Sequence, residues 1–146
     1  FAWPLPFGSA KADHRILFDQ PEPAPIRRIG SEPGLIDPAP RPTPVDGRVL
    51  RPTAALFEED AIIWDQLASR SLRWGADTGS QLRIAFPDTP WLGLWQKPGA
   101  RYLCIEPWAG MADPAGFDGE IWDKPGIIAL PPGEERAFSM DVTLER

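Results

Sequence analysis

The sequence predicts an all-β protein, an antiparallel sandwich or barrel, and three observations carry this prediction. Nineteen prolines among 146 residues suit a loop-rich β protein better than a helical bundle, because proline removes a backbone donor and breaks helix interiors. From Ser69 onward, apolar segments of strand length recur about every ten residues, which is typical of sandwiches and barrels. The last segment has the two-residue period of a strand, with polar residues between Phe138, Met140, Val142 and Leu144.

The remaining elements follow from local composition. Residues 1–7 are expected to be extended, because Pro4 and Pro6 exclude a helix, and residues 14–18 are a short strand candidate. The proline-rich residues 21–52 are expected as long loops with brief edge strands, packed over a sheet. Residues 57–67 allow a helical turn as readily as a strand. Six later strands are expected at residues 69–75, 80–87, 91–97, 101–108, 125–133 and 136–145.

Composition excludes several classes of function. The net charge of −6 and the pI of about 4.8 give no basic surface for nucleic acid, so a neutral or modestly charged ligand is the simpler expectation. The single Cys104 cannot form an intramolecular disulfide, and no Cys/His spacing resembles a zinc site. We therefore expect a reducing setting with no metal and no cofactor.

The compartment is predicted from what the sequence lacks. No apolar run is long enough to span a bilayer, so no membrane contact is expected, and the opening residues lack the basic end of a signal peptide. The cytoplasm is the expected location. Because the chain opens at Phe1 within an apolar, proline-rich stretch, we interpret it as a fragment of a longer protein.

Glu106 is the strongest candidate for chemistry. In a strand over residues 102–108, Leu103 and Ile105 face one side, while Glu106 shares the other side with Cys104 and two aromatic residues. A carboxylate beside aromatic rings is poorly solvated, which favours its protonated form and suits a general base near neutral pH. The alternative is a strand-end glutamate paired with a neighbouring cation, Lys97 or Arg101.

The preceding strand repeats this pattern and suggests a sugar site. Trp91, Gly93, Trp95 and Lys97 fall on one face of residues 91–97. Aromatic rings pack against the C–H faces of a pyranose, and its hydroxyls need charged hydrogen-bond partners. Because the chain has seven tryptophans, any one of them can equally be a core residue.

Two further residues were considered as site candidates. Asp60 is the member of its acidic cluster nearest an apolar run, although from the residues alone a structural role is the simpler interpretation. His14 is the only histidine and has no serine or cysteine motif near it, so no nucleophilic triad is predicted. We expect His14 on the surface of a strand.

Together these segments resemble the aldose 1-epimerase (galactose mutarotase-like) superfamily, in particular its LacX-like bacterial branch. The resemblance runs over nearly the whole chain, and its most specific part is LGLWQKPGARYLCIEPW, in which a Trp-containing strand leads to the strand of Glu106. Weaker parts are FAWPLPFG, DHRILF, PAPIRRI, LFEEDAII, ADPAG, KPGIIAL and PPGE. The resemblance implies that residues 1–146 are the C-terminal part of one antiparallel β-sandwich domain, the galactose mutarotase-like supersandwich.

The resemblance also implies an activity. A glutamate at the position of Glu106 removes the proton of the anomeric hydroxyl while a histidine protonates the ring oxygen, and the ring opens and closes again as the other anomer. Asp60 matches an acidic residue that holds sugar hydroxyls, and Trp95, Lys97 and Trp108 are the expected sugar contacts. The acid lies in a Gly-x-His-Pro stretch directly before the segment that matches FAWPLP, and His14 does not match it.

The implied partners are a small sugar and the N-terminal half of the same domain, which also supplies an arginine and a second histidine. Self-association into a homo-oligomer is left open. Three alternatives remain: a non-catalytic carbohydrate-binding protein on the same scaffold, a structural sandwich domain of a larger glycan-processing enzyme, and a hexose-6-phosphate 1-epimerase. The last would need a phosphate pocket built from Arg27, Arg28 and Lys97.

Overall fold

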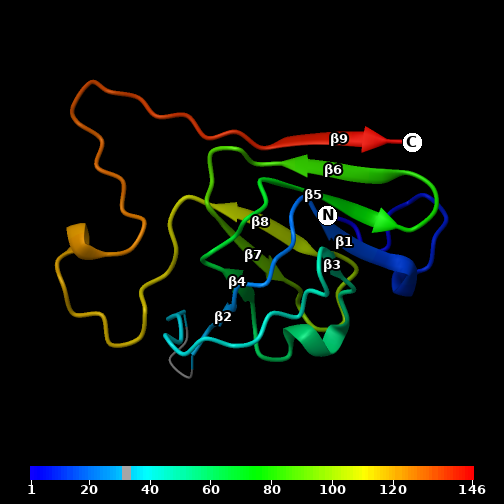
Figure 1. Cartoon of the computed structure of the whole chain (residues 1–146), viewed down its shortest axis with the longest axis horizontal. Coiled ribbons are helices and arrows are strands. Elements are labelled where there is room, and N and C mark those ends of the chain that lie inside the picture. Colours follow the sequence, from blue (N-terminus) through cyan, green and yellow to red (C-terminus); the bar gives the residue numbers. More distant parts are fainter. Residues whose placement is uncertain (31–33) are drawn as a thin grey trace.

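A computed structural model describes residues 1–30 and 34–146 and contains two antiparallel sheets (Figure 1). The five-stranded sheet has the order β3 (Val49–Leu50), β1 (His14–Phe18), β5 (Ser71–Ala76), β6 (Gln81–Ala85) and β9 (Asp141–Glu145). The four-stranded sheet has the order β2 (Arg27–Arg28), β4 (Ile62–Trp64), β7 (Trp91–Trp95) and β8 (Cys104–Trp108). Helical structure in the described residues is confined to three short 3₁₀ turns, η1 (Lys11–Asp13), η2 (Ala54–Phe57) and η3 (Ile121–Asp123).

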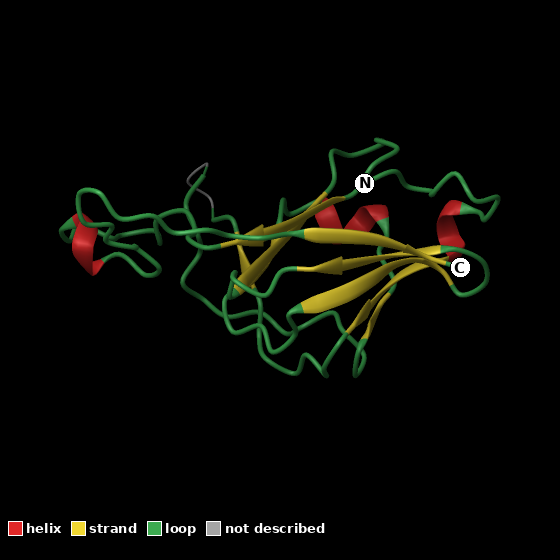
Figure 2. Ribbon diagram, turned by 90° about the horizontal axis from the view of Figure 1, so that it is seen from above, coloured by secondary structure: helices red, strands yellow, loops and turns green. Residues whose placement is uncertain are grey.

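The two sheets pack face to face around one main core, and the layers are seen edge-on in Figure 2. Strand alternation sends one set of side chains from each sheet into this core. The five-stranded sheet contributes Ile16, Phe18, Leu50, Leu72, Trp74 and Ile84, and the four-stranded sheet contributes Ile62, Trp64, Leu92, Leu94 and Ile105. The predicted all-β sandwich is therefore confirmed.

The proline-rich segment forms one edge of each sheet, in line with the brief edge strands that were predicted. Its only named strands among the described residues, β2 and β3, are two residues long and lie at the sheet ends.

Residues 57–67, for which a helical turn and a strand were both expected, contain part of each structure. They begin at the end of η2, turn at Asp60, and continue as β4, whose three residues are all buried.

Two expectations for the C-terminal part were wrong. Residues 125–133 form no strand but belong to a long segment, residues 109–140, whose middle extends away from the sheets and carries η3 (Figures 1 and 2). The final strand exists as β9, but the apolar side of residues 138–144 is exposed to solvent rather than buried. The side chains of Phe138, Met140, Val142 and Leu144 are 44–49% exposed, because β9 is an edge strand and no further strand of the described chain lies beyond it.

His14 is buried, with 2% of its surface exposed, so its expected position on the strand surface was wrong. Its Nε2 accepts a hydrogen bond from the Leu5 backbone N–H at 2.9 Å, and Nδ1 lies 2.9 Å from the Ala10 carbonyl. The ring also packs against Trp74 at 5.2 Å between centroids. His14 therefore helps to attach the N-terminal segment to the five-stranded sheet, together with Trp74, whose indole N–H donates to the Ala2 carbonyl at 3.1 Å. Across the described residues, no helix is long and apolar enough to cross a lipid bilayer.

Candidate functional site

The outer face of the four-stranded sheet carries the candidate residues. Register places Glu106 of β8 beside Gly93 of β7, Gly93 beside Ile63 of β4, and Ile63 beside Arg27 of β2. Because facing residues in a sheet point to the same side, these four positions form one row across the sheet. The predicted separation of faces is confirmed, since Leu92, Leu94, Leu103 and Ile105 lie in the core.

Glu106 is half-buried near the middle of β8, two residues from Cys104 on the same face. Burial raises the pKa of the Cys104 thiol, and the neighbouring Glu106 carboxylate raises this pKa further by its negative charge and by accepting a hydrogen bond from the thiol. The alternative of an ion pair with Lys97 or Arg101 is not realised, because no ion pair of the described residues includes Glu106.

The absence of a side chain at Gly93 makes room beside Glu106, and Trp108 fills it. A methyl group on Gly93 would lie 2.5 Å from Cζ2 and 2.9 Å from Cε2 of Trp108, so the indole lies directly against the β7 backbone. Trp91 is held in a similar way, because its ring occupies the space where a side chain on Gly126 would lie. The indoles of Trp91 and Trp108, which pair across β7 and β8, thus each pack against a glycine.

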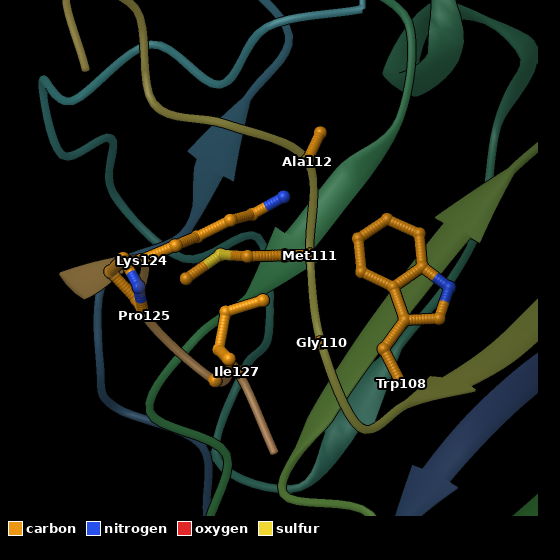
Figure 3. Close-up of a pocket in the computed structure, with 8 residues that line it drawn as sticks. Trp108, Gly110, Met111, Ala112, Lys124, Pro125 and Ile127 are labelled. Carbon is orange, nitrogen blue, oxygen red and sulfur yellow. The ribbon is translucent and has the colours of Figure 1, made fainter. Parts of the chain in front are cut away.

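A pocket of about 410 Å³ adjoins Trp108 on the same side of the sheet. Figure 3 shows Met111 extending toward Lys124, Pro125 and Ile127, with Trp108 as the aromatic wall. Lys124 forms an ion pair of 2.5 Å with Asp113. The volume lies within the usual range for small-molecule sites, whose walls are mostly apolar with a few polar groups.

Trp95 and Lys97 differ in how close they lie to the outer face of the four-stranded sheet. Trp95 is half-buried, contacts the small apolar cluster around Ile63, and lies 6.3 Å from the Tyr102 ring between centroids. Lys97 lies two residues beyond the end of β7, is exposed, and takes part in no ion pair of the described chain. The structure therefore brings Trp95 onto the site face and leaves Lys97 at its margin.

Asp60 lies at the turn that leads into β4, two strands away from Glu106. It is exposed, has a left-handed backbone conformation with φ of 64°, and accepts a hydrogen bond from the Ala61 N–H at 2.7 Å. Arg28 supports this turn by donating to the carbonyl oxygens of Leu56 at 2.8 Å and Asp60 at 3.1 Å. Desolvation lowers the pKa of Arg28 despite the nearby acidic residues.

Asp65 and Met111 help to shape this face, but they were not singled out from the sequence. Asp65 forms a 2.8 Å ion pair with Arg27 at its far edge, and Met111 enters the site face from the segment after β8. The signal for Asp65 was available, because it lies two residues after Ile63 and so shares its face. Nothing in the local sequence around Met111 indicated its contact with the sheet, which depends on the path of the segment.

No protein-family model matches the sequence, and no curated protein is similar enough to match it. Solved structures do match. A galactose mutarotase-like protein from Lactobacillus casei superimposes with a TM-score of 0.77 at 20% identity over 92% of this chain. A galactose mutarotase related enzyme from Lactobacillus acidophilus superimposes with a TM-score of 0.79 at 27% identity over all of it. The chain has the galactose mutarotase-like fold.

The chain spans about half the length of these mutarotase-like structures, 47% of the first and 49% of the second. The matched proteins are thus about twice as long as this chain. The resemblance expected from the LGLWQKPGARYLCIEPW block is confirmed at the level of fold.

Proposed function

We propose that this chain is the C-terminal part of an isomerase of the aldose 1-epimerase type, which interconverts the anomers of a free sugar. The observation that carries the proposal is the row on the outer sheet face, where Glu106 stands beside Gly93 and the Trp108 indole on a mutarotase-like fold. A half-buried carboxylate next to an aromatic platform can accept a proton from a sugar whose C–H face packs on the ring.

The reaction balances without a cofactor. The Glu106 carboxylate accepts the proton of the anomeric hydroxyl while an acid donates a proton to the ring oxygen, and the bond between C1 and the ring oxygen breaks. C1 becomes an aldehyde carbon, which turns about the C1–C2 bond. Closure in the reverse sense returns both protons and gives the other anomer. The acid comes from outside residues 1–146, because both ring nitrogens of His14 are engaged by backbone groups.

The other candidate residues have supporting roles in this proposal. Trp108 and Trp95 provide aromatic surfaces on the same face as Glu106, and Asp60 and Lys97 approach from its edges to bind sugar hydroxyls. Asp60 keeps Oδ2 as an acceptor for a sugar hydroxyl, because the Ala61 N–H donates to Oδ1. We rank Trp108 first among these contacts.

The proposed partner is the N-terminal half of the same domain. The apolar side of residues 138–144 supports this, because its four large side chains remain about half exposed, and Val142 and Leu144 pair with Ile84 and Leu82 on the core side of the sheet. Exposed apolar patches next to free sheet edges favour association. When the other half is absent, a second copy of the chain can cover this patch as a homo-oligomer. The cytoplasmic location stays a prediction.

The hexose-6-phosphate alternative receives less support from the geometry. Arg27 is paired with Asp65, and the Arg28 guanidinium is bound by backbone carbonyls. Both lie on β2, at the opposite edge of the sheet from β8. These two arginines are therefore committed to structural contacts rather than gathered with Lys97 around a phosphate.

The test is a Glu106→Gln variant of the longer protein that contains both halves. Gln keeps the shape and hydrogen bonding of the side chain but cannot accept the proton, so mutarotation should fall by about 10²- to 10⁴-fold while sugar binding persists. Polarimetry on freshly dissolved α-glucose and α-galactose measures the rate, and calorimetry measures binding. Near-normal turnover in the variant would remove Glu106 as the base. A parent protein that binds sugar without turnover would favour the carbohydrate-binding alternative.

A further inference from the structure

A second pocket lies on the outer face of the four-stranded sheet, next to the pocket that has Trp108 as its wall. Its volume is about 180 Å³, and Met111 and Pro125 border both pockets. The smaller pocket is lined by Asp65 and Arg27, which form the ion pair at the far edge of this face. The two pockets are therefore neighbouring compartments that meet at Met111 and Pro125.

Asp65 belongs to the row of the sheet that carries Trp108. Trp64 of β4 pairs with β7, and the next step of this register places Asp65 beside Trp91. Trp91 in turn pairs with Trp108. Because β4 and β8 are two strand spacings apart, their backbones are separated by roughly 10 Å. A sugar ring that stacks on Trp108 with its anomeric hydroxyl at Glu106 thus leaves Asp65 at the far end of the same face.

One oxygen of the Asp65 carboxylate lacks a hydrogen-bond partner. Oδ2 accepts from Arg27 Nε at 2.8 Å, while Oδ1 is buried and has no partner among the described residues. Arg27 is itself held in place, because its Nη1 donates to the Pro38 carbonyl. Buried acceptors in folded proteins are nearly always paired, since leaving one unpaired is destabilising. The Oδ1 atom of Asp65 therefore calls for a hydrogen-bond donor.

The surroundings of Asp65 favour a neutral donor. The Arg27 guanidinium already offsets the charge of the carboxylate, so a second cation would gain little, whereas a hydroxyl can donate to Oδ1 without adding charge. The other residues that line the smaller pocket are apolar: Ile36, Pro38, Met111, Pro114 and Pro125. Apolar walls with one acceptor suit a sugar ring, which has apolar C–H faces and donating hydroxyls.

Met111 is the lining residue that can move. Three residues of the smaller pocket are prolines, and Arg27 is fixed by two hydrogen bonds. Methionine has three rotatable bonds and repacks readily, and Figure 3 shows the Met111 side chain extending toward Pro125. Because Oδ1 of Asp65 is buried, a ligand reaches it only when a side chain moves. A rotamer change of Met111 would join the two pockets into one groove.

We propose that the two pockets form one groove for a reducing disaccharide, in which Asp65 Oδ1 accepts a hydrogen bond from a hydroxyl of the second ring. The first ring stacks on Trp108 with its anomeric hydroxyl at Glu106, and the larger pocket of about 410 Å³ is sufficient for it. The second ring displaces Met111 and ends at Asp65. The position of the first ring rests on the proposed function, and Asp65 selects extended sugars over single ones.

Asp65→Asn in the longer protein tests the acceptor. The amide oxygen replaces Oδ2 opposite the Arg27 donor, so the NH₂ group takes the position of Oδ1 and the acceptor is lost. Polarimetry gives kcat/KM for maltose and cellobiose relative to glucose. This ratio should fall about 10- to 100-fold, the effect of one hydrogen bond to a charged group. Asp46→Asn removes an exposed carboxylate next to β3 of the other sheet and should leave the ratio unchanged.

Met111→Ala provides a second test that does not depend on the folding of the Asp65 variant. It removes the side chain that has to move, so the same ratio should rise. Urea unfolding shows which variants are folded. An unchanged ratio in both folded variants, or a parent that binds disaccharides no more tightly than glucose, would overturn the groove and leave Oδ1 with an ordered water only.

Calorimetry separates the groove from the enzymatic proposal. Disaccharide binding that weakens in Asp65→Asn, in a protein that epimerises no sugar, would uphold the groove and remove the isomerase role. Mutarotation of glucose by a protein that binds no disaccharide would uphold the isomerase and overturn the groove.

Discussion

The Trp108 indole lies against the backbone of Gly93, the residue that pairs with Glu106 across the sheet. Gly93 therefore decides where the largest aromatic surface beside the proposed base can lie. An added methyl group would meet Trp108 Cζ2 at 2.5 Å, which forces the ring to move because the backbone of β7 cannot.

The first prediction is that Gly93→Ala displaces Trp108. Overpacking of this kind costs about 1–3 kcal/mol, so the variant should lose that much stability in urea unfolding and show altered tryptophan fluorescence. In the longer protein it should weaken sugar binding through the same displacement. Gly110→Ala is the control, because the nearest atom to its added methyl group is 3.8 Å away. Equal effects of the two substitutions would show that Trp108 is not held by Gly93.

The second prediction concerns the reactivity of Cys104. Because burial and the Glu106 charge raise the pKa of this thiol above its ordinary value, its thiolate should form only at alkaline pH, and alkylation by iodoacetamide should lag behind that of a cysteine peptide. Glu106→Gln removes the negative charge, so the pKa of Cys104 should fall and its alkylation at pH 8.5 should accelerate. Glu120→Gln removes a distant exposed charge as the control. Identical rates in all three proteins would contradict the coupling.

The third prediction concerns His14 as a structural residue. His14→Phe leaves the Leu5 N–H buried without an acceptor, which should cost about 1–3 kcal/mol of stability in thermal or urea unfolding. His14→Gln can replace both hydrogen bonds in part and should recover some of this loss. In the longer protein, mutarotation by the folded Phe variant should stay close to that of the parent. A large loss of turnover without loss of stability would assign His14 to the chemistry.

The fourth prediction concerns the exposed side of β9. The chain of residues 1–146 should self-associate through Val142 and Leu144, which are 49% and 45% exposed, and sedimentation velocity should detect oligomers. Replacing both residues by Lys should reduce this association. Thr143→Lys adds one lysine to the opposite face of β9 and is the control, to be compared with Val142→Lys alone, which adds the same charge to the apolar face. A parent that sediments as a compact monomer would count against the role of this face as a contact surface.

Much of the fold was accessible from the sequence because strand alternation is local. The two-residue period separated Leu103 and Ile105 from Glu106 correctly, and the proline-rich stretch was correctly expected at the sheet edges. The period could not say whether an apolar face is covered. The alternation of residues 138–144 is real, yet this face is exposed, because coverage depends on which other strands reach it.

Residues 125–133 were wrongly expected as a strand because a short apolar run bounded by proline has the same local pattern in a strand and in an extended loop. His14 shows a further limit of local patterns. Its burial depends on Leu5 and Ala10, whose backbone groups meet it only after the N-terminal segment folds over β1.

By itself, the sequence determined the fold class, the face of Glu106 and the resemblance, because all three are properties of short segments. The tertiary structure alone decided that Trp108 fills the space above Gly93 and that the Arg28 guanidinium binds the backbone of the turn at Asp60. It also decided that Lys97 lies at the margin of the site face. It also decided that the chain entering β8 pairs with Phe1. These relationships join residues that are distant in the chain, and only the register between strands brings them together.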